Sequence, residues 1–321
     1  MSRELKRALR RDCAALLLAA LLLRGAASGS SLFFTKPAVR QEAATLTLRF
    51  RDVPEETAPA QNSAPAEMDL PAADTTPVFT AADAALVSVA GNCTRSYDAE
   101  ALLTGTEEAF ADTTEPQLLI VHTHGTESYT PADGEDYERL TEWSTLDAGH
   151  SVIRVGEAIR ERLAERGIVA VHDETLCDYP VYRGAYDRME AVIADDLARY
   201  PSIRMVLDVH RDAFDDPDGS AGTTARDGVA RIMLVVGTDE GGLYHPDWQP
   251  HLGLAMQLQV LLERTSPGIT RPISLCRQRY NQHMTPCSLL AEFGANGDSL
   301  EEALRAAELF ADALAALLLP A

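Results

Sequence analysis

The sequence lacks the features that mark several common classes of protein. Its cysteines are few and widely spaced and form no CxxC pair: Cys13, Cys93, Cys177, Cys276 and Cys287. We therefore expect neither a disulfide framework nor a cysteine-based zinc site, since both are built from regularly spaced cysteines. The helical HExxH motif of common metalloproteases is also absent. No internal repeat is evident, which argues against a solenoid or a propeller.

Positive charge is scarce as well. The 321 residues contain 28 Lys and Arg against 49 Asp and Glu, which gives a net charge of −21. Affinity for nucleic acid depends mostly on Lys and Arg, so we expect no nucleic-acid partner. Aromatic residues make up only 6% of the chain, but apolar residues reach 46%, which is enough for a sizeable core.

Residues 1–34 read as an N-terminal signal or membrane anchor. The basic stretch MSRELKRALRRD precedes the apolar run CAALLLAALLL, and small residues follow. This order is typical of a secretory signal, and the run is shorter than the roughly 20 residues of a usual spanning helix. Cleaved signal and retained anchor both remain open, and both place most of the chain outside the cytoplasm.

Residues 35–115 read as a flexible acidic linker. They are rich in Pro, Ala, Thr and acidic residues and show no sustained periodicity. Such a segment buries too little apolar surface to offset the entropy cost of ordering it. We expect it to tether a distal domain at residues 116–321.

The distal domain alternates strand-like and helix-like segments. Apolar runs typical of buried strands occupy residues 117–124, 168–174, 203–212, 230–237 and 287–296. Helical spacing occupies residues 151–167, 185–200, 251–268 and 299–319. Gly167 suits a helix end, and Ser299 with Glu302 suits a capping box at a helix start. The alternation predicts an α/β domain with a mostly parallel, twisted sheet and helices on both faces.

Three of the predicted strands end in chemically capable residues, in the phrases IVHTHGTE, VLDVHRD and LLAEFGAN. Ligand sites in open parallel sheets form beyond the carboxyl ends of the strands, so we expect these endings to meet. His124, Glu127 and His210 would supply two imidazoles and a carboxylate, a common set of catalytic zinc ligands. Glu292 would act as general base. The residues alone favour a metal site and leave the class of enzyme undecided, because Glu127 also suits a turn or helix cap.

The phrases HTHGTESY, DVHRDA and LAEFGAN, in this order, resemble the stage II sporulation protein P family. That family is related to the zinc-dependent N-acetylmuramoyl-L-alanine amidases. The resemblance covers residues from about 117 to the end, together with the anchor and the linker. It implies an amidase-like fold.

The resemblance also implies a function. It implies a zinc-dependent peptidoglycan hydrolase that cleaves the amide between N-acetylmuramic acid and L-alanine, with a further action on peptide cross-links. It implies work during engulfment, at the septum between mother cell and forespore. The implied partners are a glycan-cleaving enzyme like stage II sporulation protein D and other engulfment proteins.

Carried over by residue, the resemblance implies that His124 and His210 bind Zn²⁺ and that Glu292 is the catalytic glutamate. The second ligand is less certain in the pattern, because Glu127 comes earlier than the amidase glutamate does. We prefer Glu127, and His122 and His150 are the alternatives. His122 could instead orient a ligand.

Arg211 follows His210 directly and has two readings. It could pair with a carboxylate of the substrate, or it could form an ion pair with Asp212 or Asp208.

Two other functions remain open at the level of sequence. One is a non-catalytic scaffold that binds the cell wall and keeps an amidase fold. The other is a zinc peptidase with another class of substrate. Retention of His124, Glu127, His210 and Glu292 together argues against the scaffold.

Overall fold

The computed structural model describes residues 77–105, 110 and 114–319. The predicted signal or anchor and most of the predicted linker lie outside these residues. Within the described residues, no helix combines the length and the apolar character that crossing a membrane requires.

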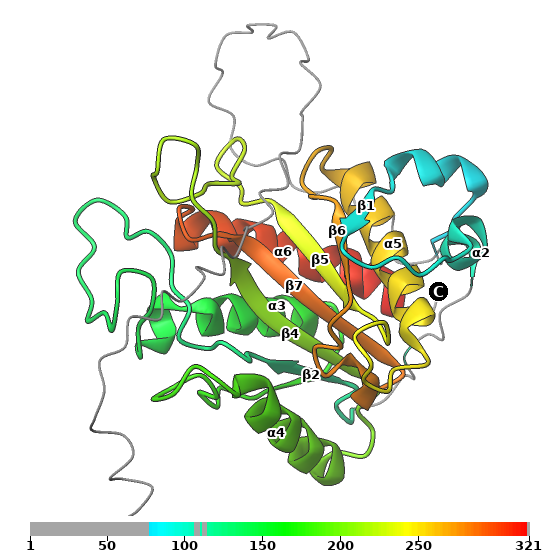
Figure 1. Cartoon of the computed structure of the whole chain (residues 1–321), viewed down its shortest axis with the longest axis horizontal. Coiled ribbons are helices and arrows are strands. Elements are labelled where there is room, and N and C mark those ends of the chain that lie inside the picture. The colour runs from blue at the N-terminus through cyan, green and yellow to red at the C-terminus, as the bar shows by residue number, and fades with distance from the viewer. Residues whose placement is uncertain (1–76, 106–109, 111–113, 320–321) are drawn as a thin grey trace, which may run out of the picture. The chain divides into compact units, whose positions relative to one another are not determined.

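A seven-stranded sheet forms the centre of the fold (Figure 1). Its strands are β1 (Val89–Gly91), β2 (Leu118–Val121), β3 (Ala170–His172), β4 (Met205–Asp212), β5 (Ile232–Gly237), β6 (Ile273–Cys276) and β7 (Cys287–Ala295). The strand order is β1-β6-β5-β7-β4-β2-β3. Every neighbouring pair is parallel except β5 and β7, which are antiparallel. The predicted α/β class and mostly parallel sheet are confirmed.

Helices cover both faces of the sheet, as predicted. They are α2 (Ala99–Thr104), α3 (Val152–Glu165), α4 (Ala185–Arg199), α5 (Trp248–Thr265) and α6 (Leu300–Leu318), with short 3-10 turns at η1 (Ala81–Leu86), η2 (Ala148–His150) and η3 (Gln282–Met284). Residues of α3, α5 and α6 share the main core with one face of the strands. Residues of α4 form a smaller core on the other face (Figure 1).

Alternation along the central strands sorts their side chains between these two faces. In β4, Leu207 and Val209 belong to the main core, whereas Val206 packs in the core beside α4. In β7, Phe293 belongs to the main core and Leu290 faces the opposite side. The polar residues of these strands that share the parity of Val206 and Leu290 therefore lie on the α4 face.

The helix boundaries follow the local signals in the sequence. Ser299 caps α6: its side chain accepts from the backbone N–H of Glu302, whose carboxylate in turn accepts from the backbone N–H of Ser299. Gly167 follows the end of α3 with a φ of 86°, a left-handed conformation that glycine adopts without steric cost. The capping box and the glycine at the helix end are both confirmed.

The fold begins earlier than the sequence indicated. The predicted linker reached residue 115, but residues 77–105 contain η1, β1 and α2. Strand β1 pairs with β6 at one edge of the sheet, and Leu103 of α2 lies in the main core. These elements are three to six residues long, so they leave almost no periodic pattern in the sequence, and tertiary pairing determines their structure.

Replacement of Phe310 by Ala tests the main core. Phe310 is fully buried, and its ring packs edge-on against Phe293 with centroids 5.1 Å apart. The change should lower the free energy of unfolding by about 3 to 5 kcal/mol because it leaves a cavity. Urea denaturation measures the effect, and Glu308→Ala on the exposed side of the same helix is the control. Equal stability of the two variants would contradict this packing.

Candidate functional site

The ends of β2, β4 and β7 meet at one edge of the sheet, as the sequence predicted. These strands are mutually parallel, with β4 in the middle. His210 of β4 lies directly opposite Glu292 of β7 in the pairing register. Asp208 lies opposite Val121, and the chain then continues from β2 into the turn that carries His124. Asp208, His210 and Glu292 all have the parity that faces α4.

Three candidate metal ligands come together at this edge. Nδ1 of His210 lies 3.5 Å from Oε2 of Glu127. The rings of His124 and His210 are nearly perpendicular, with centroids 5.4 Å apart. Glu127 is preferred as the second ligand on sequence grounds, and it is the carboxylate beside His210.

Asp208 holds His210 in place, a role that we did not assign from the sequence. Nε2 of His210 lies 2.9 Å from Oδ1 of Asp208. Asp208 in turn accepts from the backbone N–H of Thr123 at 2.8 Å and from its hydroxyl at 2.6 Å. The signal was available, because residues two apart on a strand point to the same face.

The carboxylates close to His210 favour the protonated, positively charged form of its ring. Burial lowers the pKa of His210, but Asp208 and Glu127 outweigh burial and hold that pKa well above the usual range. The site thus favours a positive charge between two carboxylates. A bound cation would satisfy the same two carboxylates, and it would displace the proton from His210.

His124 is held by aromatic side chains. Tyr182 stacks on its ring at 4.3 Å between centroids, and Tyr186 packs edge-on at 5.5 Å. Nδ1 of His124 is buried and has no hydrogen-bond partner in the described residues. Burial and the nearby His210 lower the pKa of His124, so its imidazole stays neutral, the form that can ligate a metal. The spacing of the two tyrosines in the sequence gave no sign of this contact.

Glu292 carries a carboxyl group whose pKa is strongly raised. Burial raises its pKa to about 8, and the nearby His210 opposes this shift. Its Oε2 atom is buried without a hydrogen-bond partner among the described residues. A buried carboxyl with a pKa near neutrality suits proton transfer, because a general base works best when its pKa is close to the working pH.

The donor set at this edge fits zinc in chemistry. Two imidazoles and one carboxylate are typical zinc ligands. Nδ1 of His124 is buried without a hydrogen-bond partner in the described residues, so its lone pair is available to a metal ion. In the part of the chain that the structure describes, no three His, Cys, Asp or Glu side chains already form a metal site. Binding of zinc would therefore require side-chain rotations that bring His124, Glu127 and His210 together.

His122, an alternative ligand, lies elsewhere and is fully engaged. Its Nδ1 lies 3.1 Å from the carbonyl oxygen of Val209, and its Nε2 lies 2.8 Å from Nε2 of His172. Nδ1 of His172 is 3.1 Å from Oε2 of Glu157. Burial lowers the pKa of His122 to about 3, which keeps the ring neutral. This relay supports the backbone of β4 next to His210.

His150, the other alternative, lies at the start of α3 with both ring nitrogens paired. Nδ1 is 2.8 Å from Oδ2 of Asp147, and Nε2 is 3.3 Å from Oε1 of Glu135. Its ring stacks on Tyr137 at 4.2 Å. None of these partners belongs to the cluster around His210.

Arg211 binds backbone oxygens. It is buried, and it donates from Nε to the carbonyl of Ser128 and from Nη2 to the carbonyl of Trp143, both at 2.8 Å. Its backbone N–H also donates to Oε2 of Glu127 at 3.3 Å. Asp212 pairs with Arg271 instead. Arg211 therefore fastens the loop that carries Glu127 to β4, a role that neither sequence reading included.

The raised pKa of Glu292 predicts that the free energy of unfolding of the metal-free protein depends on pH. A carboxyl that titrates near 8 when folded and near 4.5 when unfolded binds its proton more tightly in the folded state. Stability is therefore lost as the pH rises from about 5 to 8. Glu292→Gln should remove this loss, roughly 2 kcal/mol once partial solvent exposure is discounted.

Urea denaturation of the metal-free full chain at pH 5 and pH 8 measures this difference. Glu308→Gln, the same chemical change at an exposed position, is the control. The assignment fails if Glu292→Gln loses as much stability between the two pH values as the wild type does.

Solved structures that are similar to this chain include amidases. It matches N-acetylmuramoyl-L-alanine amidase AmiC2 of Nostoc punctiforme with a TM-score of 0.36 and 15% identity, over 63% of this chain and 95% of that chain. It matches the CwlD amidase from Clostridioides difficile, solved in complex with the GerS lipoprotein, with a TM-score of 0.38 and 15% identity, again over 63% and 95%.

Comparison of sequences gives the family. The chain is 30% identical over 207 residues to Stage II sporulation protein P of Bacillus subtilis (strain 168), which covers 61% of this chain and 49% of that protein. The chain thus spans about half the length of this relative. The family model of Stage II sporulation protein P matches residues 52–315, far more than half of the chain. The chain belongs to the Stage II sporulation protein P family.

Proposed function

We propose that this protein is a zinc-dependent peptidoglycan hydrolase that cleaves the N-acetylmuramoyl-L-alanine amide. The observation that carries the proposal is the meeting of His124, Glu127, His210 and Glu292 at the carboxyl ends of three parallel strands. Membership in a sporulation protein family supports the choice of peptidoglycan as substrate. Peptide cross-links are the second class of bond to test.

His124, Glu127 and His210 would hold the zinc ion. Zinc bound there would polarise the carbonyl of the scissile amide and lower the pKa of water. Asp208 fixes the ring of His210, and Arg211 fixes the loop of Glu127 through Ser128 and Trp143. The chain therefore holds its donors through contacts outside the donor set, as metal sites require.

Glu292 would move the proton. It lies beside His210 in the sheet, and burial raises its pKa to about 8 in the metal-free protein. In its ionised form it would accept a proton from water and return it to the leaving nitrogen. Tyr182 and Tyr186 shield His124. Shielding from solvent strengthens the electrostatic interactions inside the site.

The cellular setting of this activity is part of the proposal. The apolar run near the N-terminus would place the protein outside the cytoplasm. The Stage II sporulation protein P family supports a location at the septum between mother cell and forespore. A glycan-cleaving enzyme like stage II sporulation protein D would act on the strands that this hydrolase strips of peptide, and other engulfment proteins would act beside it.

Variants of two site residues separate metal binding from catalysis. Glu292→Gln should keep zinc and lower the rate of hydrolysis by about 10² to 10⁴ because it removes only the proton acceptor. His210→Ala should lose zinc and activity together. Zinc content of the full chain is measured by elemental analysis, and peptidoglycan digestion by mass analysis of released stem peptides with a new N-terminal L-alanine.

His150→Ala is the matched control, because His150 is a histidine whose partners, Asp147 and Glu135, lie outside the assigned ligand set. It should keep zinc and activity. Near-full activity of Glu292→Gln would refute the assigned mechanism, and loss of zinc in His150→Ala would refute the assigned ligands. Zinc without any cleavage of peptidoglycan would favour a wall-binding scaffold.

A further inference from the structure

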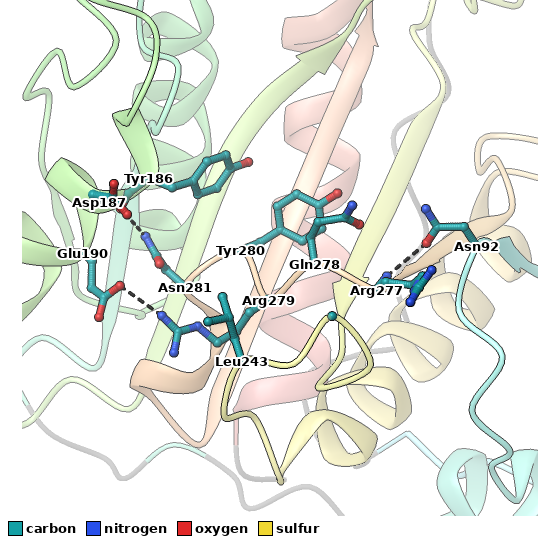
Figure 2. Close-up of a pocket in the computed structure, with 11 residues that line it drawn as sticks. Asn92, Tyr186, Asp187, Glu190, Leu243, Arg277, Gln278, Arg279, Tyr280 and Asn281 are labelled. Carbon is teal, nitrogen blue, oxygen red and sulfur yellow. Dashed lines mark hydrogen bonds and ion pairs between the residues drawn. The ribbon is translucent and has the colours of Figure 1, made fainter. Parts of the chain in front are cut away.

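A pocket of about 500 Å³ opens on the α4 face of the sheet, beside the candidate site (Figure 2). Its walls come from α4, from the loop after β5 and from residues 277–281 after β6. Tyr186 joins the pocket to the site, because it lines the pocket and its ring also packs edge-on against His124. Tyr280 lies next to it, with ring centroids 5.6 Å apart.

The wall formed by residues 277–281 is held in a fixed shape. Asn281 donates from its side chain to the carbonyl of Tyr186 at 2.7 Å. Gln282 donates to the carbonyl of Val235 at 2.8 Å and accepts from the backbone N–H of Gly237 at 2.6 Å. Tyr280 and Asn281 both have positive φ, 52° and 59°. Such backbone strain persists only where surrounding contacts enforce it, and it is common at ligand sites.

The charges of the pocket are separated. Figure 2 shows Asp187 and Glu190 at one end and Arg277 with Asn92 at the other. Arg279 neutralises Glu190 through a contact of 3.0 Å. The lining residues at the far end, Arg277 and Asn92, present a guanidinium group and an amide and no carboxylate.

Arg277 is accessible, and among the described residues no carboxylate lies within hydrogen-bond distance of its guanidinium group. Its side chain is 54% exposed, and its contact with Glu240 is long, 3.9 Å. Glu240 is already engaged with the backbone N–H and the hydroxyl of Thr94, at 2.7 and 2.6 Å. The backbone N–H of Arg277 donates to Asn92, which fixes the position of the residue. A guanidinium group with open donors on a fixed backbone suits a carboxylate, which it can bind through two parallel hydrogen bonds.

A hydrolase of the muramoyl-peptide amide must hold the peptide on one side of the cleaved bond, and stem peptides carry free carboxylates. Arg211 cannot bind them, because its guanidinium is buried on the carbonyls of Ser128 and Trp143. We propose that the pocket binds the peptide portion of the substrate and that Arg277 pairs with a peptide carboxylate. The identity of the ligand rests on the proposed function.

Binding measured without hydrolysis tests the pocket. The full chain carrying Glu292→Gln is titrated by calorimetry with a synthetic stem peptide that begins with L-alanine, and with the same peptide with amidated carboxylates. Adding Arg277→Ala should weaken binding of the free acid about tenfold and leave the amidated peptide unchanged, because a charge-assisted hydrogen bond is lost. Arg277→Lys should recover only part of the affinity, since an ammonium group cannot form the two-pronged contact.

Arg199→Ala is the matched control, because Arg199 is an exposed arginine at the other end of α4 that contacts the ring of Tyr200. It should leave peptide binding unchanged. The pocket assignment would be overturned if the Arg277→Ala and Arg199→Ala proteins bound the free acid with equal affinity. It would also be overturned if the Glu292→Gln protein did not bind the peptide. Thermal unfolding of each variant identifies any that fails to fold, and Arg277→Lys then takes its place.

Kinetics on a soluble muropeptide separate this inference from the proposed function. In an active enzyme, Arg277→Ala should raise KM about tenfold with kcat nearly unchanged, because the contact lies away from the reacting amide. If Arg277→Ala left KM unchanged, the pocket assignment would be overturned and the proposed hydrolase activity would stand. Absence of hydrolysis together with Arg277-dependent binding would overturn the hydrolase and leave a peptide-binding pocket.

Discussion

The parallel pairing of β2, β4 and β7 is the constraint on which the site depends. Parallel strands end at a common edge, so His124, His210 and Glu292, far apart along the chain, arrive within reach of one another. The pairing register of the strands then determines which face each side chain occupies, because a shift of one residue would turn His210 and Asp208 towards the main core. The apolar residues that alternate with them, such as Leu207 and Val209, make that shift costly.

Contacts outside the cluster fix the orientation of its side chains. Thr123 holds Asp208, and Asp208 holds His210. On the other face of β4, His122 reaches the carbonyl of Val209. Strand β4 is thus held from both faces at Val209 and His210. Such bracing lowers the entropy cost of assembling a site from separate strands.

Sequence reasoning recovered the parts of the fold that leave long periodic patterns. The runs around β2, β4 and β7 and the capping box at Ser299 are local signals, and the rule for parallel sheets brings the strand ends together. Strand β1 was missed because it lies within the segment predicted as a linker, and β6 because its four residues stand outside the longer apolar runs. The role of Arg211 was missed for another reason: its partners are backbone carbonyls, which no residue type reveals. Asp208 was recoverable from its parity with His210.

The antiparallel step between β5 and β7 divides the sheet into two blocks with opposite polarity. The loops after β5 and β6 therefore leave from the edge opposite His210, and residues 277–281 reach Tyr186 on the α4 face of the sheet (Figure 2). The candidate site residues of β4 and β7 and the pocket wall at residues 277–281 consequently come from separate blocks of the sheet. Residues 277–281 follow β6 and not β4 or β7, so a change in their side chains would alter the pocket wall and leave the pairing of β4 with β7 intact.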